Sequence, residues 1–302
     1  MKRLRRRLLG SAVVGLSGAA AFAIVAVVIV VMATIVVGGK DTISWEFLST
    51  APREGMTEGG ILPAIVGMAL RVLIMSIAGV PVGVITAVYL SEYASAQSRL
   101  ARAIRFAVNT LAGVPAIVFG LFGLGFFVQF VGSGMDTLLS DGTDLHWAQP
   151  NLLWASLTMA LLTLPVVIVS VEEAIKTVPQ DLRAASLALG ATKWQTIWHV
   201  VLPNSLTGIL TGGILAVSRG AGEVAPILFT GAAYFLPQLP GSLSDQFMEL
   251  GYHVYIMATQ STNVDATIGI QYATTLVLLT ITFMLNFSAI FLRSRIRARQ
   301  MR

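Results

Sequence analysis

The chain has 302 residues, of which 55% are hydrophobic and only 12% are charged. Because a soluble domain carries about 25% charged residues, this composition excludes an ordinary soluble protein. The absence of cysteine excludes a disulfide scaffold and catalysis by a thiol. The net charge of +5 does not predict a nucleic-acid partner, because the basic residues flank apolar runs as they do in membrane proteins.

Six long apolar runs follow one another along the chain, each of about 20 residues or more, the length that crosses a membrane as a helix. The first follows the basic segment MKRLRRR. It is longer than the apolar part of a cleavable signal peptide, about 7–15 residues, so we expect an uncleaved first span. The runs are approximately 10–37, 61–90, 106–131, 151–171, 204–230 and 266–292. The sequence therefore predicts an all-α, polytopic integral membrane protein with six transmembrane helices in residues 10–292, between basic tails at 1–9 and 293–302.

Lysine and arginine are distributed unevenly along the chain. Sixteen of the 20 lie in the two tails and in the segments that follow the second and fourth runs. These four segments share one side of the membrane, because successive runs cross it in opposite directions. Cytoplasmic segments are the ones enriched in lysine and arginine. We therefore expect both termini and these two connecting segments in the cytoplasm.

The second run contains one charged residue, Arg71. It lies in the half of the run that we expect to be outermost. A long arginine side chain there can reach outward to the membrane interface, pair with Glu223 or with a partner subunit, or contact a substrate. The residues alone leave these alternatives open.

The third run, which includes GVPAIVFGLFGLG, has Pro115 and several glycines in its interior, among them Gly120. This composition predicts a broken or kinked helix. Such a helix is tolerated in a membrane where it faces protein or a cavity, as at the binding sites of transporters. A glycine-rich face for helix packing is an equally good interpretation.

The cytoplasmic segment 172–205, between the fourth and fifth runs, has several helix signals. Pro179 ends the preceding helix and Asp181 is placed to cap a new one. Gly190 suits the left-handed residue after a helix, and Thr192 suits the cap of the next one. We expect a helix–glycine–helix hairpin with small residues on its surface, which let another protein approach closely. An amphipathic hairpin lying on the membrane is the alternative.

The fifth run contains two charged residues, Arg219 and Glu223, four positions apart. A charge at the bilayer centre costs about 2.5–3.5 kcal/mol on insertion scales, so neither should face lipid. At this spacing we expect them to share one helix face with a ladder of small residues. The ladder consists of Gly208, Gly212, Ala216 and Gly220.

The ladder permits two arrangements around the charges. Small residues let a neighbouring helix come close, or they leave space for a solvated substrate. Arginine offers a permanently charged, planar fork of donors that suits an oxyanion such as phosphate. We therefore expect Arg219 and Glu223 to line a substrate pathway that Gly212 and Gly220 help to shape. A buried ion pair that locks the fifth helix to its neighbours is the alternative.

The connector at 232–265 is long for a plain loop. Its aromatic residues favour packing at the outer interface, and an aromatic belt without a further role is an equal alternative. These residues are Tyr234, Phe235, Phe247, Tyr252 and Tyr255.

Several kinds of site are missing from the sequence. The three histidines, His146, His199 and His253, do not have the spacing of metal ligands, and no zinc-binding H-E-x-x-H motif or intramembrane pair of aspartates is present. The segment GGKD at 38–41 lacks the other residues of a phosphate-binding P-loop. We expect no metal, no cofactor and no enzymatic activity of the chain itself.

The segment AASLALG…VVLP resembles the cytoplasmic signature loop of ABC importer permeases. Ala184, Ala185 and Ser186 occupy the positions of the family's Glu-Ala-Ala triplet, and Gly190 and the Leu-Pro pair at 202–203 are in place. Ala184 stands where the family usually has glutamate. The resemblance implies that the loop is a coupling helix that docks into a groove on an ATPase subunit. The residues implied for that contact are Ala184, Ala185, Leu189, Gly190, Ala191, Thr192 and Trp194.

Four further segments together resemble the A-type permease subunits of phosphate importers (PstA). They are YLSEYA, AGVPAIVFGLFGLGF, SRGAGEVAPILFTGAAYF and YHVYIMATQ. The resemblance implies an ABC importer permease fold in the bacterial cytoplasmic membrane and transport of phosphate driven by ATP. It implies four partners besides membrane lipid: a homologous C-type permease subunit, two ATPase subunits and an extracytoplasmic phosphate-binding protein. An importer of another oxyanion, such as sulfate or molybdate, is the alternative, and the coupling loop argues against a self-contained ion-coupled transporter or channel.

Overall fold

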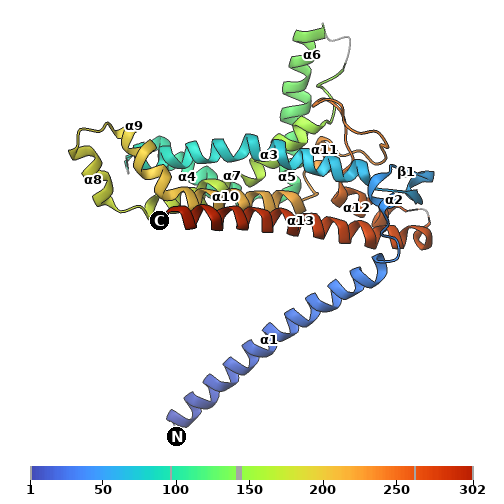
Figure 1. Cartoon of the computed structure of the whole chain (residues 1–302), viewed down its shortest axis with the longest axis horizontal. Helices are drawn as coiled ribbons and strands as arrows, with labels where there is room; N and C mark the ends of the chain where they lie inside the picture. The colour runs from blue at the N-terminus through green and yellow to red at the C-terminus, as the bar shows by residue number, and fades with distance from the viewer. Residues whose placement is uncertain (1, 96, 141–144, 262, 301–302) are drawn as a thin grey trace.

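The structure is a computed structural model that describes residues 2–95, 97–140, 145–261 and 263–300 (Figure 1). It is mostly helical, and one small sheet within these residues pairs β1 (Pro52–Arg53) with β2 (Glu58–Gly59) in antiparallel register. The helices, including 3-10 and π segments, are α1 (Lys2–Gly39), α2 (Trp45–Ser49), η1 (Glu54–Met56), α3 (Leu62–Val88), η2 (Tyr89–Tyr93), α4 (Arg99–Leu111), α5 (Ala116–Gly123), η3 (Leu124–Gly132), α6 (Ser133–Ser140), α7 (Leu152–Lys176), α8 (Gln180–Ala188), α9 (Lys193–Thr196), η4 (Ile197–Val201), α10 (Leu202–Gly222), α11 (Ile227–Thr230), α12 (Leu250–Gln260) and α13 (Val264–Gln300).

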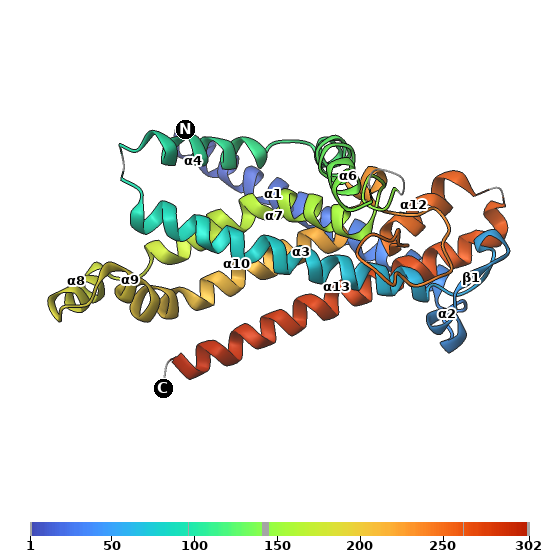
Figure 2. The same cartoon turned by 90° about the horizontal axis from the view of Figure 1, so that it is seen from above.

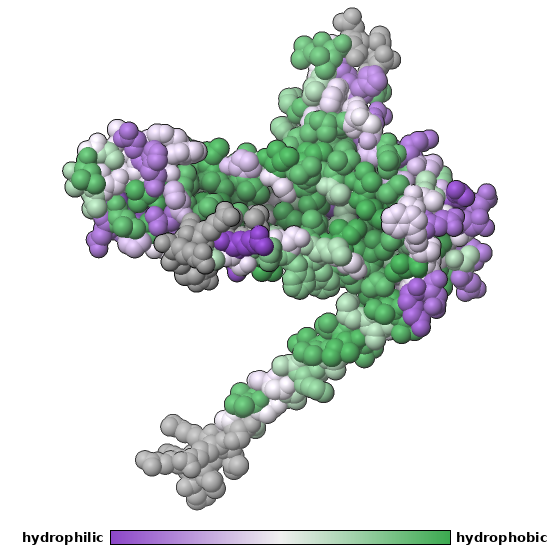
Figure 3. All heavy atoms as spheres, viewed as in Figure 1, coloured by the Kyte–Doolittle hydropathy of each residue, from purple (hydrophilic) through white to green (hydrophobic). Residues whose placement is uncertain are grey.

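Within the described residues, six helices are long and apolar enough to cross a membrane. They confirm the six predicted spans, although their bounds differ from those of the apolar runs. The six are Ala12–Gly39, Leu62–Tyr93, Ala116–Leu139, Leu152–Lys176, Lys193–Gly222 and Val264–Arg295. Hydrophobic side chains cover most of the middle of the molecule in Figure 3, and hydrophilic ones gather at the α8–α9 end and at the β1–α2 end. This distribution suits a protein that crosses a bilayer.

Four of these helices, α3, α7, α10 and α13, run lengthwise beside one another in both cartoon views (Figures 1 and 2). The fourth span, α7, lies between α3 and α10 and is the most deeply buried, because both neighbours pack along it. By contrast, α1 projects away from the bundle in Figure 1 and meets α13 beside its own last residues. A β-carbon added at Gly39 would lie 2.7 Å from the backbone nitrogen of Ala273, so glycine permits this crossing.

The beginning of α1 and the end of α13 both point toward the α8–α9 end in Figures 1 and 2. This is the arrangement that termini on the same side as the coupling loop require. The side of the membrane on which they lie stays a prediction.

The third apolar run is divided into two helices. Its first part belongs to α4, which is capped by the side chain of Ser98. The chain then turns through 112–115, and α5 begins after Pro115, whose extended backbone (φ −57°, ψ 138°) forms the start of the helix. Because proline lacks an N–H donor and disfavours helical backbone in the residue before it, it belongs at a helix start. The predicted break is confirmed, but the span begins at Ala116 rather than at residue 106.

The connector at 232–265 folds back onto the bundle. Phe247 is fully buried and pairs with Ala232 in an isolated bridge. Tyr252 and Tyr255 stack with their ring centroids 6.3 Å apart, and Tyr255 is exposed. Packing is therefore the role of Phe247, whereas Tyr234 and Phe235 are 46% and 39% exposed. The second half of the connector is the helix α12.

Candidate substrate pathway and coupling site

The helix α10 ends at Gly222, one residue before the predicted substrate residue Glu223. Glu223 is extended (φ −91°, ψ 128°), and a short helix, α11, resumes after Pro226. The prediction that Arg219 and Glu223 share one helix face is therefore wrong. The cause is Pro226, which cannot donate the hydrogen bond that would continue the helix and whose ring clashes with the carbonyl four residues earlier.

The break separates the environments of the two charged residues. Arg219 is exposed on α10, whereas Glu223 is half-buried. In the ranges that the structure describes, no ion pair joins them. The alternative of a buried Arg219–Glu223 lock is therefore wrong.

The small-residue ladder of α10 packs against other helices. A β-carbon at Gly212 would lie 3.0 Å from that of Ser170 on α7. Gly208 is in still closer contact with Ala174, and Gly220 with the sulfur of Met75 on α3. Close approach of helices is thus confirmed, and the alternative of an open space at these glycines is wrong. Gly212 and Gly220 allow α10 to pack closely against α7 and α3 and so fix its position.

Gly120, on α5, lies against the break that follows α10. A β-carbon at this position would lie 2.8 Å from the carbonyl oxygen of Pro226 and 3.0 Å from the ring of Phe229. The helix that starts at Pro115 therefore lies directly against the break that follows Gly222. Irregular backbone in a membrane needs such a protein environment.

Arg71, on α3, is completely buried and binds the end of α10 and the start of α12. Its Nη2 forms an ion pair with Glu249 Oε1 at 3.1 Å, and its Nη1 donates a hydrogen bond to the Gly220 carbonyl at 2.9 Å. The other carboxylate oxygen of Glu249 accepts a hydrogen bond from the backbone of Tyr252 and so caps α12. Arg71 therefore does not reach outward or pair with Glu223, and its partner was missed by the sequence reasoning. The available signal was an acidic residue immediately before a helix-forming segment.

The predicted helix–glycine–helix hairpin is confirmed in α8 and α9. Gly190 has φ +87°, a conformation that favours glycine. Thr192 accepts a hydrogen bond from the backbone of Gln195, whose side chain accepts one from Thr192 in return. Asp181, however, lies in the first turn of α8 and does not cap it, because Pro179 occupies the cap position. A proline there already leaves one fewer backbone donor to satisfy.

The hairpin presents its predicted contact residues outward. Leu189, at the tip, is 90% exposed, and Trp194 is exposed and stacks on Trp198 with centroids 5.7 Å apart. Of the other predicted positions Ala191 is half-buried, and Ala184, Ala185, Gly190 and Thr192 are exposed. The second arm continues without interruption from Lys193 to Gly222. The hairpin is therefore joined directly to the helix that carries Arg219.

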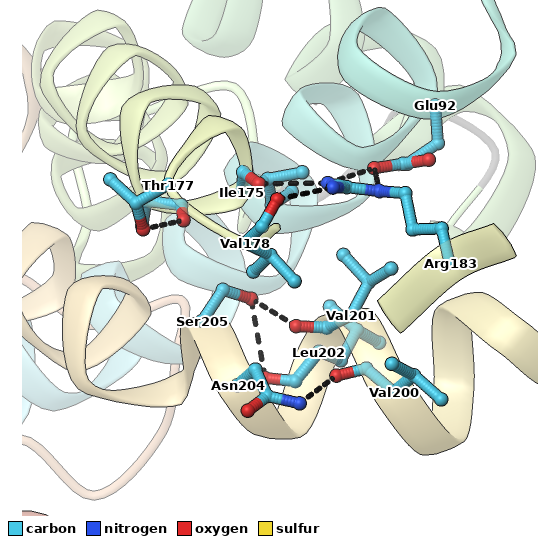
Figure 4. A network of polar contacts seen from close by, with 11 residues as sticks. Glu92, Ile175, Thr177, Val178, Arg183, Val200, Val201, Leu202, Asn204 and Ser205 are labelled. Atoms are coloured by element: carbon cyan, nitrogen blue, oxygen red, sulfur yellow. Dashed lines mark hydrogen bonds and ion pairs between the residues drawn. The ribbon is translucent and has the colours of Figure 1, made fainter. Parts of the chain in front are cut away.

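Arg183 fastens the hairpin to the ends of two spans (Figure 4). Its guanidinium donates to Glu92 Oε1 through Nε at 3.2 Å and Nη2 at 2.9 Å, and each of these side chains is 11% exposed. It also donates to the carbonyl oxygens of Ile175, at 2.9 Å, and Val178. Sequence reasoning missed this contact, because Glu92 and Arg183 are distant in sequence.

Residues 79–298 match the sequence profile of the binding-protein-dependent transport system inner membrane component. The chain belongs to this permease family. Membership makes it a multi-pass protein of the bacterial inner membrane and a transport subunit rather than an enzyme. The family works with an ATPase on a separate subunit and with a substrate-binding protein.

Curated relatives of this permease include the probable ABC transporter permease protein YqgI of Bacillus subtilis, which is 30% identical over 275 residues. That alignment covers 87% of this chain and 88% of the relative. The phosphate transport system permease protein PstA of Yersinia pestis is 37% identical over 202 residues, 67% of this chain. The permease spans 59% of the length of the Yersinia relative.

A solved bacterial alginate ABC transporter, in complex with an alginate-bound periplasmic protein, supports the fold. Its matched chain has a TM-score of 0.60 and 15% identity, with 88% of each chain covered. At this identity the likeness concerns the fold alone. The ABC importer permease fold expected from the sequence is therefore confirmed.

Proposed function

We propose that this permease is the A-type subunit of an ABC importer that moves inorganic phosphate across the cytoplasmic membrane. The observation that carries the proposal is the position of Arg219. It is an exposed arginine near the end of an apolar span, and that span is continuous with the hairpin that would contact the ATPase. Relatives named as phosphate transport permeases support the choice of substrate.

Arg219 and Glu223 supply complementary chemistry for an oxyanion. The guanidinium offers paired donors to phosphate oxygens and keeps its charge. Glu223 lies just beyond the end of α10. Its carboxylate repels the negatively charged phosphate and so weakens the binding of phosphate to Arg219. Binding by the first and release assisted by the second would let phosphate pass without being trapped. Gly120, Gly212 and Gly220 shape this pathway through the helix contacts described above, and Pro115 does so by setting the start of α5.

Partner subunits complete the proposed transporter. A homologous C-type permease would cover the exposed side of α10, because a charged side chain facing lipid is costly. Two ATPase subunits would receive the α8–α9 hairpins of the two permeases, and an extracytoplasmic phosphate-binding protein would deliver the substrate. Closure of the ATPases would then rock the permeases between outward-open and inward-open states.

Uptake of radioactive phosphate by cells that lack other phosphate importers tests the proposal. Arg219→Ala should abolish uptake at normal expression, while Arg219→Lys should retain part of it because a point charge remains. Glu173→Gln, which removes an exposed carboxylate of the same chain, is the control and should transport normally. Normal uptake by Arg219→Ala would overturn the assignment of Arg219 to the substrate pathway. Uptake of sulfate or molybdate that excess phosphate does not inhibit would overturn the assignment of phosphate as the substrate.

A further inference from the structure

The helix α3 joins the two functional ends of the molecule. It begins near β2 and continues through η2 to the α8–α9 end (Figure 1). Two charged residues hold it, Arg71 toward one end and Glu92 at the other. At the rise of an α-helix these residues are about 30 Å apart. Both make long-range polar contacts with segments that belong to the proposed transport machinery.

At the hairpin end, both arms of the hairpin hold α3. The first arm does so through Arg183, which forms the largely buried ion pair with Glu92. The second arm does so through Lys193, whose Nζ lies 5.0 Å from the ring centroid of Tyr93. A hydrogen bond of 2.9 Å between Ser186 and Thr196 ties the arms together. A displacement of the hairpin therefore acts on the end of α3.

At the opposite end, Arg71 holds the break in α10. The carbonyl of Gly220 lacks its usual helical donor, because Val224 lies beyond the end of the helix. Arg71 Nη1 donates to this carbonyl instead, and Arg71 Nη2 binds Glu249 at the start of α12. An end carbonyl of α10 and the cap of α12 are thus attached to the same point on α3.

We propose that α3 is a second transmission element, which carries movement of the hairpin to the break beside Arg219 in parallel with α10. Its two joints are the Arg183–Glu92 pair and the contacts of Arg71 with Gly220 and Glu249. Because the hairpin is attached to both helices, it moves α3 and α10 together. The end of α10 and the start of α12 then move together, instead of α10 moving alone. Arg71, Glu92, Arg183 and Glu249 are positioning residues in this arrangement. The inference rests on the proposed function for the direction of transport and on family membership for the ATPase.

The absence of cysteine permits a direct test in the assembled transporter. Gly222 is exposed, and a β-carbon added there meets no atom within 4 Å, so Gly222→Cys provides a reporter beside the break. With cysteine-free partner subunits in proteoliposomes, the rate of maleimide labelling at this position is measured before and after ATP is added. ATP hydrolysis is measured in the same samples.

The Glu92→Gln variant should retain ATP hydrolysis but lose most of the ATP-dependent change in labelling. We expect that change to fall by about fivefold or more, the size of an ordinary coupling between two sites. Glu173→Gln makes the same chemical change in an exposed pair with Lys176 and should behave as the parent does. Combining Glu92→Gln with Arg183→Lys should add little to either single change, because the two residues act through each other.

Glu249→Gln provides a second variant at the far joint, in case Glu92→Gln does not assemble, and should also reduce the labelling change while hydrolysis continues. An unchanged response in Glu92→Gln and in Glu249→Gln would overturn the proposal. Loss of hydrolysis in an intact Glu92→Gln complex would also overturn it, because the pair would then serve ATPase docking. The labelling requires no phosphate transport, so an error in the assigned substrate would leave this test intact.

Discussion

Arg71 and Glu249 form an ion pair 178 positions apart in sequence, and neither side chain is exposed. Each charge is shielded by protein, so each depends on the other for compensation. The pair connects a transmembrane helix to α12, the short helix in the second half of the 232–265 connector. Glu249 also caps that helix, so its loss would disturb two kinds of contact at once.

Arg71→Ala should destabilise the permease by about 3–5 kcal/mol, because it leaves a buried carboxylate without its partner. The melting temperature of the purified protein in detergent measures the effect. Replacing both residues, as in Arg71→Met with Glu249→Leu, should cost less than Arg71→Ala alone. Arg53→Ala, at an exposed position, is the control. Equal melting temperatures for Arg71→Ala and Arg53→Ala would contradict the role of the pair.

Glu223→Gln should slow the release of phosphate. Removing the carboxylate leaves Arg219 unopposed, so binding strengthens and both KM and the maximal uptake rate decrease. A charge-assisted interaction of about 1.5–3 kcal/mol corresponds to roughly a 10–100-fold change in affinity. Uptake measured over a range of phosphate concentrations checks this expectation. A higher KM at an unchanged maximal rate would show that Glu223 assists binding instead.

Gly120→Ala should impair folding, because the added carbon approaches the carbonyl of Pro226 at 2.8 Å. Overpacking of this kind costs about 1–3 kcal/mol. Gly125→Ala makes the same substitution where no atom lies within 4 Å and should be neutral or slightly stabilising. Melting temperatures of the two variants provide the comparison, and a smaller loss for Gly120→Ala than for Gly125→Ala would contradict the contact.

Leu189→Asp should prevent co-purification with the ATPase without altering the stability of the permease. Leu189 is 90% exposed at the tip of the hairpin, so its replacement disturbs no packing within this chain. A charge at the centre of a docked apolar contact is costly unless it is paired. Retention of the ATPase by this variant would exclude the tip from the interface.

The stability of the permease should decrease below about pH 6.5 because of His253. Burial lowers the pKa of this residue to about 4, so the folded protein keeps it neutral while the unfolded chain takes up a proton between these values. Stability then falls with decreasing pH, by about 1.4 kcal/mol for each pH unit in this window. Melting temperatures from pH 5 to 8 should show a weaker dependence in His253→Leu than in the parent. An equal dependence in both would assign the effect to other groups.

Features that depend on neighbouring residues were predictable from the sequence. Gly190 and Thr192 gave the hairpin its turn and cap, since each acts within a few positions. Pro115 likewise indicated where the third run breaks. The break before Pro226 followed from the same chemistry but was missed, because the apolar run was interpreted as one continuous helix.

Contacts between distant segments were not predictable in the same way. Nothing local to Arg71 indicates Glu249, and nothing local to Arg183 indicates Glu92. Arg219 and Glu223 were placed on one face by helical spacing, which the end of α10 invalidates. The charged pairs that hold the helices together are determined by tertiary packing, which local sequence patterns do not reveal.

The length of α10 gives its attachment to the hairpin a mechanical consequence. Arg219 lies about 25 Å along the helix axis from Leu202, at the rise of an α-helix. A tilt of about 5° at the hairpin would therefore sweep the guanidinium through about 2 Å, while a hydrogen bond is lost when its atoms separate from about 2.9 to 3.6 Å. If phosphate binds Arg219 as proposed, such a tilt would be large enough to break its hydrogen bonds to the guanidinium.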